Sequence, residues 1–126
     1  EKTMKTLLIC LFFIFSALSH HSFSVEYDDA NPIDLEGEIT SIEWINPHTF
    51  IHIKVTNHSE KNWAIEGGTP NSLMRKGLTK DTIKVGTEII VRGYQSKDKV
   101  CNPECKASGR DITLKNGKKL FQKVSK

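Results

Sequence analysis

The sequence lacks the short motifs that mark most small enzymes. Its 126 residues contain no glycine-rich phosphate loop, no Gly-x-Ser-x-Gly nucleophile elbow and no His-Glu-x-x-His zinc motif. The carboxylates are scattered, and no two of them suggest a general acid paired with a general base. A chain of this size also has little room for a second lobe that would enclose a deep cleft. We therefore expect that the protein is not an enzyme.

A strong charge of either sign is also missing. Eighteen Lys and Arg against fifteen Asp and Glu leave a net charge of +3, and the two signs are mixed along the chain. A nucleic-acid-binding domain usually concentrates its basic residues on one face. The only basic cluster is the C-terminal end, with Lys115, Lys118, Lys119, Lys123 and Lys126. We interpret it as a solvated terminus and do not expect nucleic acid to be the partner.

Long apolar runs are limited to one, near the start of the chain. Residues 7–15 are apolar, Lys2 and Lys5 precede them, and the small residues Ala17 and Ser19 follow. This order is typical of a secretory signal peptide, and the run is far short of the roughly 20 residues of a membrane-spanning helix. We predict a cleaved signal peptide over residues 1–19, with a short extension ahead of the first methionine. The mature protein would be periplasmic or secreted, without a retained membrane anchor.

Cysteine is scarce, and only two of the three cysteines lie beyond the predicted signal peptide, Cys101 and Cys105. In an oxidising compartment a disulfide is the default for such a pair. Pro103 suits the tight turn that a bridge between them needs. A metal-bound or redox-active thiol pair stays open as the alternative.

Alternation of apolar and polar residues predicts a series of β-strands. Over residues 35–44 the alternation slips by one beside Gly37, which indicates a β-bulge in a long, bent strand. Residues 48–56 alternate strictly, and the core side of this strand is expected to carry Thr49, Ile51, Ile53 and Val55. Further strands are predicted at 61–66, 87–94 and 109–114, and the Asn116-Gly117 turn leads from the last of these to 119–121.

One short helix interrupts the strands. Thr69 is a suitable N-cap, Pro70 suits the first helical position, and Gly77 closes a helix over residues 70–76. Three strands, a helix and two more strands are the order of an OB-fold, a partly open barrel of five strands. We predict a mainly β fold, a small OB-like barrel over residues 34–126, preceded by an irregular arm over residues 20–33. A β-sandwich would not place the single helix there.

Two histidines would stand at the mature N-terminus if cleavage follows Ser19. The α-amine and imidazole of His20 could chelate one metal ion, and His21 could complete the set. Nitrogen donors of this kind suit Cu(II) or Ni(II). His48, directly after the Asn46-Pro47 turn, is the best candidate for a third ligand, which makes copper the candidate cofactor. The alternative is an exposed terminus that binds no metal specifically, and we expect His58 to be an ordinary turn residue.

Aromatic side chains mark a candidate surface for a ligand or a partner protein. Phe50 lies on the non-core side of the strand 48–56 and needs either a cover or a partner. The candidate face comprises Trp44, Phe50, His52 and Trp63. Because large aromatic residues dominate small cores, the two tryptophans could serve in the core or at its rim instead. We also expect residues 23–27 to fold back across Phe50 and carry His20 and His21 toward His48.

Several strings of residues stand out along the chain: His20-His21-Ser22-Phe23, Trp44-x-Asn46-Pro47-His48, Asn62-Trp63-Ala64-Ile65-Glu66 and Arg110-Asp111-Ile112-Thr113-Leu114. Together they resemble one family of small exported bacterial proteins, the domain of unknown function 6152. The resemblance implies an exported, single-domain protein of a Gram-negative bacterium and implies no activity. The sequence departs from the expected family pattern in its loop from Cys101 to Cys105.

Three hypotheses about function follow. The first is a periplasmic binding module that holds copper through His20, His21 and His48. The second is a structural or interaction module that docks on an envelope protein through the face around Phe50. The third is an OB-fold that binds an oligonucleotide or a saccharide on its second and third strands.

Overall fold

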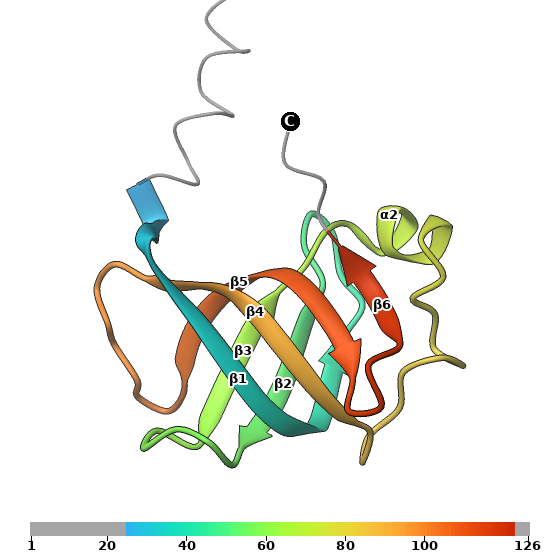
Figure 1. The fold of residues 1–126 in the computed structure, drawn as a ribbon. Coiled ribbons are helices and arrows are strands. Elements are labelled where there is room, and N and C mark those ends of the chain that lie inside the picture. The colour runs from blue at the N-terminus through green and yellow to red at the C-terminus, as the bar shows by residue number, and fades with distance from the viewer. Residues whose placement is uncertain (1–24, 123–126) are drawn as a thin grey trace, which may run out of the picture.

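The computed structural model describes residues 25–122, which form six strands and one short helix (Figure 1). The elements are β1 (Tyr27–Glu43), β2 (Phe50–Val55), β3 (Asn62–Glu66), α2 (Pro70–Arg75), β4 (Glu88–Ser96), β5 (Cys105–Leu114) and β6 (Lys119–Gln122). Within these residues no helix has the length and apolar character needed to cross a membrane.

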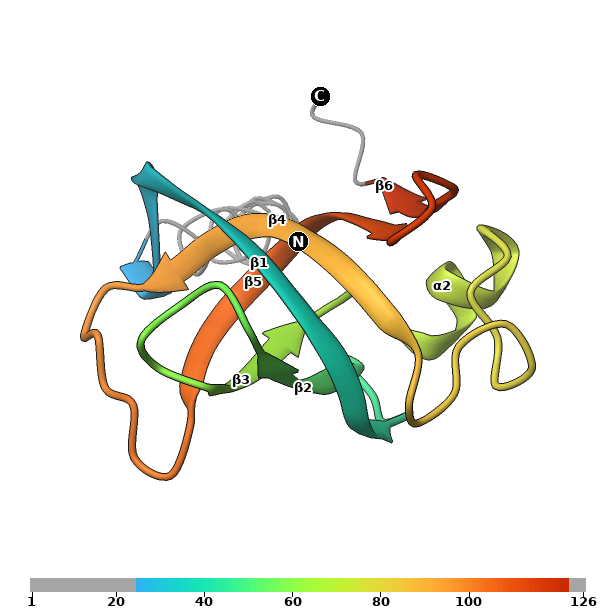
Figure 2. The same ribbon diagram turned by 60° about the horizontal axis from the view of Figure 1, so that its bottom comes forward.

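Five of the strands close into a ring. β1 pairs with both β2 and β4, β2 pairs with β3, and β4 pairs with β5, all of them antiparallel. A parallel pairing of β3 with β5 completes the ring, and β6 extends the sheet beyond β5 (Figure 2). With α2 between β3 and β4, the predicted five-stranded OB-like barrel with one short helix is confirmed.

The inward side chains of the ring form the core. The predicted alternation in β2 is confirmed, because Thr49, Ile51, Ile53 and Val55 are all buried. Other strands contribute Leu35, Ile39, Trp63, Ile65, Ile89, Val91, Cys105, Ala107 and Ile112, and residues in and after α2 contribute Leu73, Leu78 and Ile83. Thr69 caps α2 by accepting a hydrogen bond from the Ser72 amide, as its sequence position predicts.

β1 is longer than predicted at its N-terminal end. The expected irregular arm over residues 20–33 is wrong for residues 27–33, which are strand. They pair with the end of β4, at Tyr27 with Ser96 and at Pro32 with Tyr94. Alternation does not reveal this part of β1 because its residues are mostly exposed on both sides. The predicted bulge is confirmed as a register shift between Ile39 and Ser41.

β5 also begins earlier than predicted, at Cys105 rather than at residue 109. Its first residues pair with β3, Cys105 standing opposite Trp63. The predicted disulfide between Cys101 and Cys105 is present, and it joins the loop to the first residue of the strand. The peptide bonds before Pro47 and Pro103 are cis.

Gly93 marks the closest approach of β4 and β5. The register of this pair shifts between Arg92 and Gly93. A Cβ atom added to Gly93 would lie 1.9 Å from the carbonyl oxygen of Ser108. Backbone atoms cannot yield as a flexible side chain can, so this crossing of two strands requires a residue without a side chain.

We expect Gly93→Ala to lower the free energy of unfolding by more than about 2 kcal/mol, because the two strands must separate to admit the methyl group. Gly67→Ala is the matched control, since its Cβ would meet its nearest neighbour, Leu73 Cδ1, at an ordinary 3.5 Å. Urea denaturation of both variants measures the difference. Equal stabilities of the two variants would contradict the close packing of β4 against β5.

Candidate functional site

One carboxylate, that of Glu66, joins residues from three parts of the barrel. Its Oε1 lies 2.8 Å from Nδ1 of His48, and its Oε2 accepts a hydrogen bond from the Tyr27 hydroxyl. Glu66 ends β3 and stands opposite Phe50, the first residue of β2. Two backbone hydrogen bonds between Thr49 and residues 67–68 continue this pairing and hold His48 beside Glu66.

The protonation of Tyr27 fixes the direction of its hydrogen bond. Burial, and next the hydrogen bond to Glu66, raise the pKa of Tyr27 well above its ordinary value. The phenol therefore stays protonated at neutral pH and donates to the carboxylate. Glu66 is thus held from one side by a neutral donor and faces an imidazole on the other.

His48 has the environment of a histidine that can bind a metal. Its side chain is 49% exposed, and Nδ1 faces the Glu66 carboxylate. Histidine ligands in metal sites usually donate their second ring N–H to a carboxylate, which fixes the orientation of the ring. Within residues 25–122, Nε2 of His48 makes no hydrogen bond or ion pair, so this nitrogen is the atom that His48 offers to a ligand.

His52 follows Phe50 by two positions in β2 and lies on the same side of the strand. Both of its ring nitrogens contact a carboxylate. Nδ1 lies 2.9 Å from Glu104 and Nε2 lies 2.8 Å from Glu43. Burial of the ring lowers the pKa of His52, but the two carboxylates raise it by more, so the pKa of His52 lies above its ordinary value. His52 therefore ties the end of β1 to the loop between the cysteines and offers no nitrogen to a metal in this arrangement.

The loop from Cys101 to Cys105 carries Glu104 to His52. Both cysteine sulfurs also lie within 4.8 Å of a Glu60 oxygen, the one grouping among the described residues with the spacing of metal ligands. Since both sulfurs are joined in a disulfide, neither is a thiolate that could bind a metal here. The disulfide instead constrains the loop that places Glu104 beside His52.

The remaining candidate residues separate into core and surface. Trp63 is fully buried and its indole N–H donates to the Glu60 carbonyl, so this residue of the expected ligand face lies in the core. Trp44 packs partly buried against the core, and Phe50 is half-buried. The ring of His58 contacts Trp63 edge-on at 5.2 Å, in agreement with an ordinary turn residue. His20 and His21 lie outside the described residues.

The sequence analysis missed the carboxylates that surround the histidines. Glu66 could have been found from the strand register, since pairing the predicted strands 48–56 and 61–66 around their turn places it opposite Phe50. Tyr27, Glu43 and Glu104 reach the site through pairings and a loop that no local pattern reveals. The face that holds His48 and His52 therefore carries three carboxylates and favours a cation over a phosphate.

The order of strands and the position of the helix define an OB-type barrel. The chain belongs to the family of unknown function DUF6152, whose sequence profile matches residues 8–103. Among solved structures it is similar to Rim1, the mitochondrial single-stranded DNA binding protein of S. cerevisiae, at 11% identity and a TM-score of 0.50 over 68% of this chain and 93% of that one. It also resembles a chain of the S. pombe Stn1-Ten1 complex, at 13% identity and a TM-score of 0.48 over 66% and 57% of the two chains. No curated protein matches the sequence significantly.

The contacts of His52 predict a stability that depends on pH. Because folding raises the pKa of His52, the charged ring stabilises the fold fully below pH about 6.5, and this contribution is lost as the pH rises through the folded-state pKa. The difference in unfolding free energy between the wild type and His52→Gln should therefore shrink from pH 6 to pH 8, as denaturation at several pH values would measure.

The same contacts can be tested by NMR titration of the His52 ring. Glu104→Gln should lower the pKa of His52, since it removes one of the two carboxylates that favour the charged ring. Glu36→Gln is the control, because in the structure its side chain does not contact His52. A His52 pKa that is unchanged in Glu104→Gln would contradict the contact.

Proposed function

We propose that the protein is an exported binding module that holds a copper ion, Cu(II), with His48 and the two histidines of its mature N-terminus. The observation that carries this proposal is the orientation of His48 by the Glu66 carboxylate, which is itself held by Tyr27. That arrangement is the usual support of a metal-binding imidazole. The α-amine and ring of His20 with the ring of His21 would supply the further nitrogen donors that Cu(II) prefers.

The position of Tyr27 supports the joining of these ligands. Tyr27 and His48 bind opposite oxygens of one carboxylate, so the start of β1 lies next to His48. Tyr27 lies seven positions after His20, and seven residue steps span at most about 25 Å when extended. The mature N-terminus is therefore within reach of His48 Nε2, in line with the expectation that residues 23–27 bring it there.

The charge of the β2–β3 face favours a cation over a nucleic acid. This face is the usual ligand surface of an OB-fold, and single-strand binding requires a positive groove with aromatic side chains for stacking. Here Glu43, Glu66 and Glu104 surround the two histidines, and Phe50 is half-buried. The likeness to Rim1 is thus a likeness of fold.

Export is supported by two independent features. The first nineteen residues have the order of a secretory signal peptide. The structure contains a disulfide, a bond that persists in oxidising compartments and is rare in the cytosol. Export would also create the free N-terminus of His20 that the proposed site uses.

Calorimetric titration of Cu(II) into the protein that begins at His20 tests the proposal. We expect His48→Ala to weaken binding by at least tenfold, and Glu66→Gln to weaken it by roughly tenfold, because loss of the supporting carboxylate typically costs 10- to 100-fold in metal affinity. One extra residue ahead of His20 should also weaken binding, since it moves the α-amine away from the His20 ring.

The matched control is His58→Ala, which removes an imidazole from a turn on the same barrel and should leave Cu(II) affinity unchanged. The site does not exist if the wild type binds Cu(II) no more tightly than His48→Ala does and if an extra residue ahead of His20 leaves the Cu(II) affinity unchanged. The interaction module that docks through the face around Phe50 would then be the better hypothesis.

A further inference from the structure

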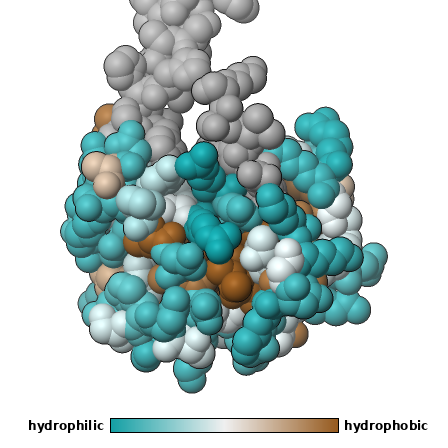
Figure 3. Space-filling view, in the orientation of Figure 1, coloured by the Kyte–Doolittle hydropathy of each residue, from teal (hydrophilic) through white to brown (hydrophobic). Residues whose placement is uncertain are grey.

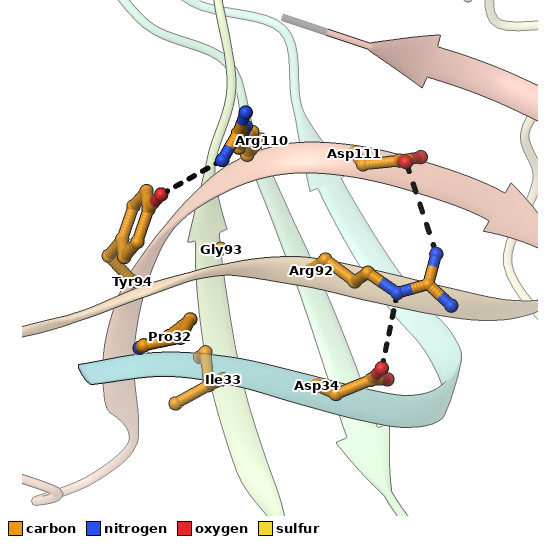
Figure 4. A pocket seen from close by; sticks show the side chains of 8 residues that line it. All are labelled: Pro32, Ile33, Asp34, Arg92, Gly93, Tyr94, Arg110 and Asp111. Atoms are coloured by element: carbon orange, nitrogen blue, oxygen red, sulfur yellow. Dashed lines mark hydrogen bonds and ion pairs between the residues drawn. The ribbon is translucent and has the colours of Figure 1, made fainter. Parts of the chain in front are cut away.

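A concave surface lies on the outside of β1, β4 and β5, apart from the histidines. It is a hollow of about 450 Å³, lined by residues 32–34 of β1, 92–94 of β4 and 110–111 of β5 (Figure 4). In the view of Figure 3, hydrophilic side chains surround a small hydrophobic area near the centre of the face that β1, β4 and β5 present. The volume lies within the range of small-molecule sites in proteins.

We propose that this hollow binds a saccharide that carries a carboxylate, such as a unit of an acidic polysaccharide. The proposal rests on the state of two side chains, Asp111 and Arg110, and on the mixture of hydrogen-bond donors and acceptors around them. It is independent of the proposed metal site.

Asp111 is an acceptor without a donor. Its side chain is only 17% exposed, and its nearest cationic group, an Arg92 nitrogen, lies 3.9 Å from Oδ2, too far for a hydrogen bond. Its other oxygen, Oδ1, is buried and has no hydrogen-bond partner among the described residues. Oδ1 is closed to solvent and hence to a ligand, so a sugar hydroxyl in the hollow would donate to Oδ2, which has no hydrogen-bond donor among the described residues.

Arg110 is a cation without an anion. Its guanidinium donates to the Tyr94 hydroxyl at 3.1 Å, and no carboxylate of the described chain lies within ion-pair distance of it. Guanidinium groups bind carboxylates in a planar, bidentate manner. Arg110 and Tyr94 lie together at one side of the hollow (Figure 4), and this side therefore suits the carboxylate of a ligand.

The other side of the hollow can adapt to a ligand. Arg92 pairs with Asp34 at 3.2 Å, but both side chains are more than half exposed, and such pairs contribute little to stability. The pair offers a donor and an acceptor to neighbouring groups. The hydroxyls of a sugar ring each donate and accept a hydrogen bond. A sugar therefore matches this mixture of donors and acceptors better than an apolar molecule or a phosphate chain does.

Backbone geometry holds the two sides in place. The hollow lies over the crossing of β4 and β5, where Gly93 has no room for a side chain. Pro32 and Ile33 of β1 supply an apolar edge, against which the carbon face of a sugar ring can lie. The site thus rests on strands and not on loops.

Amide NMR titration of the full mature protein with digalacturonic acid tests the proposal, with EDTA present to exclude metal. We expect shifts confined to the amides of residues 33–34, 92–94 and 110–111, and affinity roughly tenfold above that for the neutral disaccharide galactobiose. Arg110→Ala should remove this preference for the acid, and Asp111→Ala should weaken both sugars. Lys115→Ala, which removes a cation outside the hollow, should change neither.

The contrary outcomes are equally specific. The absence of shifts in these residues at millimolar digalacturonate would overturn the site. Equal losses in Arg110→Ala and Lys115→Ala would show general charge attraction instead of a site, and would overturn it as well. A tripeptide of the same charge that binds here more tightly than the sugar would overturn the ligand class. None of these outcomes bears on Cu(II) binding at His48.

Discussion

The parallel pairing of β3 with β5 is the constraint on which the rest of the structure depends. It closes the ring of strands and buries Trp63 opposite Cys105. It brings the end of β3, which already lies beside His48, into the barrel wall, where Glu66 also meets Tyr27 at the start of β1. It also places the start of β5, and with it the loop that carries Glu104, within reach of His52 on β2. The contact of Glu66 with Tyr27 and the contact of His52 with Glu104 are therefore products of ring closure, whereas the β2–β3 pairing alone places Glu66 beside His48.

Local patterns in the sequence were sufficient to predict the parts of the fold that depend on residues close together in the chain. Alternation predicted the core side of β2, the slip beside Gly37 predicted the bulge of β1, and Thr69 with Gly77 predicted the limits of α2. The same reasoning failed where a strand exists because of a distant partner. The first residues of β1 and of β5 alternate poorly or lie in polar surroundings, and only pairing with β4 and β3 makes them strand. The candidate site divides in the same way: His48 was visible in the sequence, but its partner Glu66 required the register.

His48, just before β2, and His52, within it, show how the surroundings of a histidine determine its contacts. A single carboxylate at Nδ1 orients His48, and Nε2 makes no hydrogen bond or ion pair within residues 25–122. Carboxylates at both nitrogens turn His52 into a structural link between β1 and the disulfide loop. The difference arises from the strand positions of Glu43, Glu66 and Glu104, not from the histidines themselves.

The great length of β1 has a consequence for the way the chain reaches its fold. β1 is an early strand, yet the partner of its first half, β4, ends at Ser96, so one edge of β1 stays unpaired until most of the chain is available. An unpaired edge is a template for aggregation, and charged side chains along it are a common protection. β1 carries Asp28, Asp29, Asp34, Glu36, Glu38 and Glu43 and no basic residue. Repulsion between the acidic β1 strands of two incompletely folded chains would oppose their association until β1 pairs with β4 of the same chain.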